Sequence, residues 1–250
     1  MEILIEDVSK VYPGGQVAVD RLTLSIPSGS TLCLLGTSGC GKTTTLKMIN
    51  RLVEPTSGRV TIGGVDVAKR DPIELRREIG YVIQGGGLFP HMTVADNVSL
   101  VGRLSGWDSG RCDARVHELL ELVQLDPATF ARRFPAQLSG GQRQRVGVAR
   151  ALMVEPPVIL MDEPFGALDP LTRHDVQQHF IALKARLAKT IVFVTHDLGE
   201  ALRMADFVAL MDGGKLVQAG TPADLWGKPA TPFVQRFVSA QATPVPGSGA

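Results

Sequence analysis

The sequence predicts an α/β fold: a mostly parallel sheet flanked by helices, antiparallel strands near the amino terminus, and an inserted α-helical subdomain. Three observations lead to this prediction. Short apolar runs alternate with segments of helical spacing on both sides of the middle of the chain. One apolar run ends in a Gly-rich loop, residues 36–43, that opens a helical segment. Between Thr93 and Met153 the spacing is helical, with almost no strand signal.

The first part of the chain contains several expected strands. Residues 2–11 and 17–26 alternate apolar and polar side chains, and Pro13-Gly14-Gly15 between them is a turn sequence. Residues 31–35 form an apolar run that suits a strand buried on both faces. Further strands are expected at 59–62 and 79–83, and helices at 42–51 and 72–77.

The remainder of the chain divides into a helical segment and a second α/β segment. Thr93 to Asp96 fits a capping-box start, and a further helix is expected at 140–153. Strands are expected at 158–161 and 190–195, with a helix at 170–188 between them. We therefore expect an α/β core built from residues 1–88 and 154–238, a helical subdomain at 89–153, and a disordered tail at 239–250, which is rich in Pro, Gly, Ser and Ala.

The composition argues against several classes of protein. A chain of 250 residues with 44% hydrophobic content can bury a sizeable core. Its net charge of +1 argues against nucleic acid as the main partner. The three cysteines lack metal-ligand spacing, which favours reduced thiols in a cytosol. The amino terminus lacks a secretory signal, and no apolar run approaches the ~20 residues that span a bilayer. We expect a soluble, cytoplasmic protein whose membrane role comes through a partner.

The Gly-rich loop has the spacing of a phosphate-binding loop. It comprises Gly36, Thr37, Ser38, Gly39, Cys40, Gly41, Lys42 and Thr43, followed by Thr44. Glycines allow backbone N–H groups to point at phosphate oxygens. Lys42 would place its charge near the β- and γ-phosphates, and the Thr43 hydroxyl would bind Mg²⁺. The alternative, a Gly-rich turn that contains Lys-Thr by chance, does not account for the flanking strand and helix. The sequence therefore predicts a P-loop NTPase core.

Polar residues end other expected strands: Asp162 and Glu163 follow residues 158–161, His196 follows 191–195, and Gln84 follows 81–83. Parallel strands end at one edge of a sheet, where α/β proteins bind ligands. Asp162 is expected to bind Mg²⁺ through water, because Mg²⁺ dehydrates reluctantly. Glu163 is expected to orient the attacking water and accept its proton. We expect His196 to reach the γ-phosphate, and Gln84 to reach Mg²⁺ or the water. Taken alone, the acid pair could instead cap a helix, and His196 and Gln84 could simply hydrogen-bond at a strand end.

Another motif, Leu138-Ser139-Gly140-Gly141-Gln142, resembles the signature of ATP-binding cassette (ABC) ATPases. With the other motifs in this order, the chain resembles a complete ABC ATPase to about Val238. The resemblance implies binding of ATP and Mg²⁺, with Glu163, His196 and Gln84 catalytic. It makes Tyr12 the adenine-stacking residue and Asp169 the D-loop aspartate, although the sequence alone allows Tyr12 simply to pack at a strand end. It also implies that Ser139 to Gln142 contact nucleotide held by a second copy, so that the working form is a homodimer.

A finer likeness points to the ATPases of osmoprotectant importers for glycine betaine, choline and related quaternary amines. It lies in residues 44–52, 54–58, 71–77, 79–84 and 87–93. Thr37 stands where the family commonly has Pro, which a loop that works through its backbone should tolerate. Gly85-Gly86-Gly87 replaces a less glycine-rich segment, and we expect this loop to be unusually mobile because glycines cost order. Many relatives continue into paired CBS domains, which this sequence lacks, so ionic-strength sensing by that route is not expected.

We interpret the chain as the nucleotide-binding subunit of an ABC importer for an osmoprotectant. The expected partners are a second copy, an integral-membrane permease docked near Gln84 and the helical subdomain, and indirectly a solute-binding protein, but not nucleic acid. The expected location is the inner face of the cell membrane, through the permease. The alternatives are an importer ATPase for another small solute such as an amino acid, an exporter ATPase, and a non-transport ABC ATPase acting on DNA or ribosomes.

Overall fold

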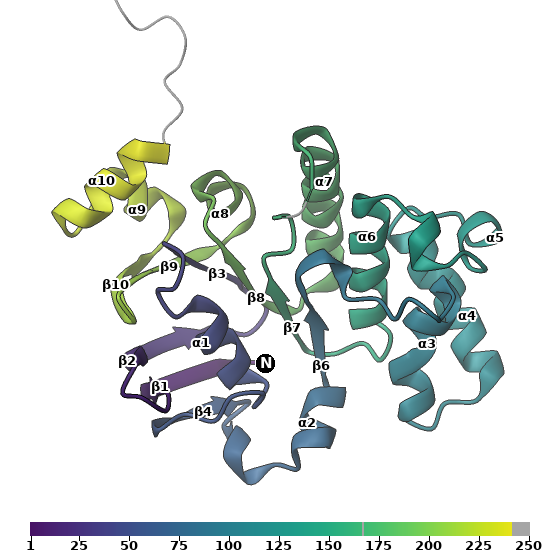
Figure 1. Cartoon of the computed structure of the whole chain (residues 1–250), viewed down its shortest axis with the longest axis horizontal. Coiled ribbons are helices and arrows are strands. Elements are labelled where there is room, and N and C mark those ends of the chain that lie inside the picture. Colours follow the sequence, from purple (N-terminus) through teal and green to yellow (C-terminus); the bar gives the residue numbers. More distant parts are fainter. Residues whose placement is uncertain (167, 242–250) are drawn as a thin grey trace, which may run out of the picture.

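The computed structural model describes residues 1–166 and 168–241, which form two sheets with helices around them (Figure 1). A four-stranded antiparallel sheet has the order β2-β1-β4-β5, and a six-stranded sheet has the order β10-β9-β3-β8-β7-β6. The first sheet comprises β1 (Ile3–Val11), β2 (Val17–Ile26), β4 (Ser57–Ile62) and β5 (Val65–Asp66). The second comprises β3 (Thr31–Gly36), β6 (Ile79–Val82), β7 (Val158–Asp162), β8 (Thr190–Thr195), β9 (Phe207–Asp212) and β10 (Lys215–Gly220).

The six-stranded sheet is mostly parallel, as the sequence predicts. Strands β9, β3, β8, β7 and β6 pair in parallel, and only β10 runs antiparallel, against β9. Because parallel strands end at the same edge, Gly36, Asp162 and Thr195 close one edge of the sheet together. That edge carries the loops with the predicted site residues.

The helices are distributed around both sheets. The α-helices are α1 (Lys42–Ile49), α2 (Pro72–Arg77), α3 (Val94–Leu104), α4 (Ser109–Leu122), α5 (Pro127–Phe130), α6 (Gly140–Ala151), α7 (Pro170–Leu187), α8 (Leu198–Met204), α9 (Pro222–Gly227) and α10 (Pro232–Gln241). Helices α3 to α6 form the teal group beside the β6 edge of the sheet, which is the expected helical subdomain (Figure 1). None of the helices in the described parts of the chain is long and apolar enough to cross a bilayer.

Local sequence explains where many of these helices begin. Asp71, Asp108 and Asp169 precede α2, α4 and α7, and each side chain accepts a hydrogen bond from a backbone N–H of the first turn. Thr93 forms the expected capping box with Asp96 at the start of α3. Such caps satisfy N–H groups that have no partner within the helix.

The parallel sheet separates two hydrophobic cores, because alternate residues of each buried strand point to opposite faces. Leu32 and Leu34 of β3 pack with α1 and the antiparallel sheet. Cys33 and Leu35 pack with residues of α3, α4, α6 and α7 on the other face. Helices α1 and α6 therefore lie on opposite faces of the six-stranded sheet.

The carboxyl-terminal boundary of the fold differs from the prediction. Helix α10 runs to Gln241, so residues 239–241 are helical although we expected them to belong to a disordered tail. The cause is packing: Val234 and Val238 are 0% and 7% exposed, and their spacing of four residues buries one face of the helix. The rest of the predicted tail, residues 242–250, lies outside the described residues.

Candidate functional site

The loop between β3 and α1 has a backbone that requires glycine at two positions. Gly36 has a φ of 147°, and a Cβ there would lie 2.2 Å from the Met211 carbonyl oxygen. Gly41 has a φ of 102°, and a Cβ there would lie 2.3 Å from the Ala18 carbonyl oxygen. Backbone atoms cannot give way cheaply at these distances. The glycines of the predicted phosphate loop are therefore needed for the loop's shape, apart from any role with phosphate.

Lys42 lies beneath this loop and holds it together. Its side chain is 5% exposed, and Nζ donates to the carbonyl oxygens of Gly36 at 2.9 Å and Thr37 at 2.8 Å. The neighbouring thiol of Cys40 is buried, and burial raises its pKa although the Lys42 charge opposes the rise. The ammonium group of Lys42 is thus fixed at the centre of the loop, where it can attract a phosphate.

An open cavity of roughly 310 Å³ lies over the loop. Eight predicted residues line it: Tyr12, Ser38, Gly39, Gly41, Lys42, Thr43, Thr44 and Glu163. Gln16 and Ala18 also line it, and sequence reasoning missed them. Gln16 directly precedes β2 and Ala18 is its second residue, and this spacing of two was the available signal, because alternate residues of an extended chain point to the same side. The cavity therefore joins an aromatic side chain, a phosphate loop and a carboxylate.

Thr43 and Asp162 meet beneath the cavity. The Thr43 hydroxyl donates to Asp162 Oδ1 at 2.8 Å, so the first turn of α1 contacts the end of β7. The described residues contain no cluster of three or more His, Cys, Asp or Glu side chains that would hold a metal without help. A hydroxyl and one carboxylate suit Mg²⁺, which keeps several waters and binds through one or two carboxylates plus substrate phosphates. The donor set therefore fits Mg²⁺ delivered with a nucleotide.

Glu163, at the end of β7, contacts two other residues that follow strands of the same sheet, Gln84 and His196. Its Oε2 accepts a hydrogen bond from Gln84 Nε2 at 3.1 Å, and its Oε1 lies 3.5 Å from His196 Nδ1. Glu163 has a φ of 43°, an uncommon conformation for a residue other than glycine, and its N–H donates to the Val194 carbonyl at 3.2 Å. The backbone thus turns sharply after β7 to direct this carboxylate at the cavity. Gln84 and His196 contact Glu163 rather than lining the cavity themselves.

The signature residues Ser139 to Gln142 lie elsewhere. Ser139 caps α6 and forms a capping box with Gln142, whose Oε1 accepts from the Ser139 N–H at 2.9 Å. None of the four lines the cavity, and α6 lies on the opposite face of the sheet from α1. The Ser139 side chain is exposed at the start of the helix. Within one chain, the amino end of α6 therefore does not contribute to the cavity over the phosphate loop.

Asp169 also stands apart from the cavity and caps α7. Its side chain accepts from the Thr172 N–H at 3.1 Å, and this hydrogen bonding holds the pKa of the carboxyl below its ordinary value. Ala167, which precedes it in the predicted D-loop, lies outside the described residues. Asp169 and the signature residues are thus the predicted site residues that the fold does not bring to the loop of Lys42.

The triple-glycine loop is fastened to α6 rather than free. Arg150 donates to the carbonyl oxygens of Gly87 at 2.8 Å and Gly86 at 2.9 Å. A Cβ on Gly147 would lie 3.0 Å from the Gly86 backbone. These contacts oppose the unusual mobility that we expect from the sequence, because they fix the segment directly after Gln84. Sequence reasoning missed Arg150, since only the fold shows which carbonyls it reaches.

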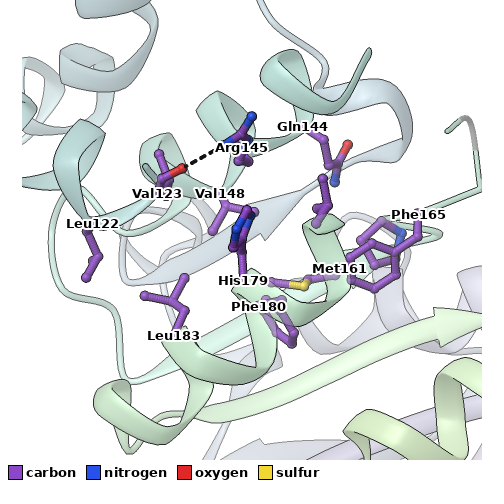
Figure 2. Close-up of a pocket in the computed structure, with 12 residues that line it drawn as sticks. Leu122, Val123, Gln144, Arg145, Val148, Met161, Phe165, His179, Phe180 and Leu183 are labelled. Carbon is purple, nitrogen blue, oxygen red and sulfur yellow. Dashed lines mark hydrogen bonds between the residues drawn. The ribbon is translucent and has the colours of Figure 1, made fainter. Parts of the chain in front are cut away.

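A narrow slot of about 30 Å³ lies between α6 and α7, and Figure 2 shows its mostly apolar lining. Gln144 Nε2 and His179 Nδ1, on residues that line the slot, are buried and have no protein partner among the described residues. A water needs ~10–15 Å³ of such space and a few polar partners. The slot is sized for water and not for a nucleotide, so it is not the candidate site.

The comparisons with known proteins agree with the geometry. A family model described as ABC transporter matches residues 19–166. The chain is 54% identical over 237 residues to the glycine betaine/carnitine/choline transport ATP-binding protein of Bacillus subtilis, covering 95% of this chain and 62% of the relative. It is 50% identical to the osmoprotectant import ATP-binding protein of Salmonella typhimurium, covering 96% and 64%. The glycine betaine uptake system ATP-binding protein of Escherichia coli is 51% identical, with 92% and 74% covered. The chain thus spans less than two thirds of the first two relatives.

Solved structures show the same fold. The dimeric post-hydrolysis state of an ATP-binding cassette bound to ADP and phosphate has a TM-score of 0.79 and 34% identity, covering 88% of this chain and 98% of that one. A component of an ABC transporter complex from Clostridium perfringens has a TM-score of 0.82 and 26% identity, covering 90% of each chain. The predicted α/β class with a helical subdomain is therefore confirmed.

Proposed function

We propose that this chain, which belongs to the ABC transporter family, is the ATP-hydrolysing subunit of an importer for an osmoprotectant such as glycine betaine or choline. The observation that carries the ATPase activity is the Glu163 carboxylate, which lines the cavity over the phosphate loop and contacts Gln84 and His196. The osmoprotectant class is supported by relatives that are 50% to 54% identical and whose names give these solutes.

The geometry supports a hydrolytic role for each strand-end residue. The Glu163 carboxylate accepts the proton of the attacking water. The Gln84 amide, which donates to Glu163 at 3.1 Å, fixes the orientation of that carboxylate. His196 stands on the other side of Glu163 and contacts the γ-phosphate. Lys42 binds the β- and γ-phosphates, and Tyr12 stacks on the base. Mg²⁺, held by Thr43 and Asp162 with Gln84 near it, would neutralise developing charge on the phosphates.

The working form in this proposal is a homodimer. Ser139 is exposed at the amino end of α6 and does not line the cavity over its own chain's phosphate loop. A second copy supplies that helix terminus to the γ-phosphate, where backbone N–H groups stabilise negative charge. Asp169, exposed at the start of α7, lies on the same interface. The solved structure of a related cassette bound to ADP and phosphate is dimeric, which supports a paired working form.

A groove beside the Gln84 loop is the proposed docking surface for the permease. It has a volume of roughly 280 Å³ and lies between β6 and the helical subdomain. Ile83 and Phe89, which line it, are 37% and 43% exposed, and Arg76, Arg77 and Arg150 line it too. Exposed apolar side chains rimmed by cations suit an apolar helix with an acidic end. The permease would hold the chain on the inner face of the membrane and couple it indirectly to a solute-binding protein.

The test of the hydrolytic role is the variant Glu163→Gln. It retains the shape of the side chain but cannot accept a proton, so ATP should bind, turnover should fall by roughly 10²–10⁴-fold, and a nucleotide-bound dimer should accumulate. Turnover is measured by phosphate release and dimer mass by light scattering. Normal turnover in this variant would rule out Glu163 as the base.

The dimer is tested by complementation. Ser139→Arg blocks the signature, and Lys42→Ala removes the phosphate contact, so each variant alone should be inactive. Mixing them creates one intact composite site per heterodimer, and phosphate release should return to a substantial fraction of the parent rate. Mixtures with no more activity than either variant would contradict the shared site.

The transported solute needs a separate test, because relatives at 46% and 47% identity are named as sulfate/thiosulfate import proteins. The full transporter, reconstituted with its permease and binding protein, should show ATP-dependent uptake of labelled glycine betaine or choline. Uptake of sulfate instead would overturn the solute class and leave the ATPase mechanism intact.

A further inference from the structure

The side-chain amide of Gln241, at the end of α10, hydrogen-bonds the backbone on both sides of Asp197. Its Oε1 accepts from the Leu198 N–H at 2.7 Å, and its Nε2 donates to the His196 carbonyl at 3.1 Å. One planar amide thus bridges a donor and an acceptor of the same backbone segment. Leu198 and His196 precede Gln241 by 43 and 45 positions in the sequence, so only the folded chain forms these hydrogen bonds.

Helix α10 carries Gln241 to this place with its buried face. Val234 and Val238 are 0% and 7% exposed and belong to the same core as Leu198 of α8. Gln241 follows them by seven and three residues, which is the spacing of one helix face. The packing of α10 on this core therefore determines where the Gln241 amide lies.

The two backbone groups have no other partner in the described residues. Leu198 is the first residue of α8, and its N–H is one of the helix's unpaired donors. The same segment is held from another side: the Thr195 hydroxyl donates to Glu200 at 2.6 Å and accepts from the Asp197 N–H at 3.1 Å. The peptide group after His196 is thus held at both ends, its N–H by Thr195 and its carbonyl oxygen by Gln241.

The side chain of His196 is exposed beside Glu163. It is 60% exposed, with Nδ1 lying 3.5 Å from Glu163 Oε1. The backbone of His196 sets the position of Cα and the direction of the Cα–Cβ bond, and the ring takes a staggered rotamer from that starting point. A displacement of the His196 backbone would therefore change the distance from Nδ1 to Glu163.

We propose that Gln241 is a positioning residue for His196, and that the seating of α10 sets the alignment of His196 with Glu163. This inference rests on the proposed function of His196 at the γ-phosphate. Gln241 does not line the nucleotide cavity, so its effect on ATP is indirect. Helix α10 thereby acts on catalysis indirectly, by positioning His196.

The first experiment observes His196 directly. The chain contains five histidines, so selective ¹³C labelling of histidine gives few ring signals, and loss of one signal in His196→Gln identifies His196. In Gln241→Ala this signal should shift and broaden. The matched control is Gln235→Ala, which truncates another glutamine of α10 that is exposed and one residue off the buried face. The control should leave the His196 signal in place.

The second experiment measures turnover. In Gln241→Ala, kcat should fall about fivefold, equivalent to ~1 kcal/mol at 1.36 kcal/mol per tenfold and close to one net hydrogen bond. The KM for ATP should stay within about twofold, because binding groups are untouched. Gln241→Glu retains an acceptor for Leu198 but no donor for His196, so it should lie between Ala and the parent in both readouts. It also serves if the alanine variant fails to fold.

The outcomes separate this inference from the proposed function. A His196 signal that stays unmoved in both Gln241 variants, or moves equally in Gln235→Ala, overturns the positioning role. Unchanged turnover in His196→Gln overturns the proposed role of His196, while a shifted signal in Gln241→Ala would still show the structural link. A fall in kcat with an unmoved His196 signal also counts against the inference, because the effect would then bypass His196.

Discussion

The sharpest quantitative prediction concerns Arg150, which fastens the loop after Gln84 to helix α6. Its guanidinium donates to Gly87 and Gly86 at 2.8 Å and 2.9 Å, and burial lowers its pKa. Replacing Arg150 with Met keeps the length of the aliphatic part and removes both donors. Only the hydrogen bonds and the charge are then lost.

The expected change in the free energy of unfolding is the balance of lost hydrogen bonds against a recovered desolvation cost. Two hydrogen bonds from a charged donor contribute ~1.5–3 kcal/mol each, and the Gly86 carbonyl, once buried without a partner, costs ~1–3 kcal/mol. These terms sum to ~4–9 kcal/mol, and removing the buried charge returns several kcal/mol of that, because the guanidinium no longer has to be desolvated. We expect the free energy of unfolding to fall by ~2–3 kcal/mol in Arg150→Met. Arg150→Lys, which cannot span two carbonyls in a planar fork, should lose about half of that.

Urea unfolding of the isolated chain, followed by circular dichroism, measures the change. Arg132→Met is the matched control, because Arg132 follows α5 and is exposed; it should stay within ~0.5 kcal/mol of the parent. The same variants should be assayed for phosphate release, where Arg150→Met should lower turnover because Gln84 loses its support. A free energy of unfolding for Arg150→Met that equals that of Arg132→Met would refute the reasoning.

Two further predictions follow. Gly141→Ala should destabilise the chain by up to ~2 kcal/mol, since the new Cβ would lie 2.3 Å from Thr172 Cγ2 and the ~1–3 kcal/mol cost of overpacking is offset by the ~1 kcal/mol that alanine gains over glycine in a helix. Adding Thr172→Ser should restore most of the loss in thermal unfolding, and no rescue would show that the clash is not the cause. Burial raises the pKa of Glu200 above its ordinary value of 4.5. At pH values between the unfolded and the folded pKa, the folded chain therefore binds more protons than the unfolded chain. The contribution of this carboxyl to the free energy of unfolding falls as pH rises through that interval. The stability of the parent minus that of Glu200→Gln, measured by urea titration across pH, should therefore decline over that interval and then level off, and a rising difference would contradict the assignment.

Much of the core could be predicted because its signals are local. Residues 32–35 are apolar without interruption, and the strand buried on both faces that the run from 31 to 35 predicts is β3. The glycines at 36 and 41 and the polar residues at the ends of β7 and β8 follow from the chemistry of phosphate loops and from the shared edge of parallel strands. The structure brings Glu163, Gln84 and His196 together as that reasoning requires.

What the sequence did not reveal depends on contacts between distant segments. The end of α10 lies in a stretch of small and polar residues, and only the burial of Val234 and Val238 makes it helical to Gln241. The expected mobility of Gly85 to Gly87 rested on glycine's backbone entropy, which the Arg150 hydrogen bonds oppose in the folded chain. No local pattern identifies an amide at 241 as the partner of a carbonyl at 196.

The arrangement of α6 explains why the signature and the Gln84 loop should act together. Ser139 stands at the amino end of this helix, Gly147 touches Gly86 in its middle, and Arg150 holds Gly86 and Gly87 near its end. A helix of 12 residues held by its hydrogen-bond ladder moves as one body. In the proposed function, a phosphate bound at Ser139 and a permease helix docked in the groove beside Arg150 would therefore contact the same helix. A shift of α6 would then move the loop after Gln84, so dimer closure and permease docking would each alter the rate of hydrolysis through this one helix.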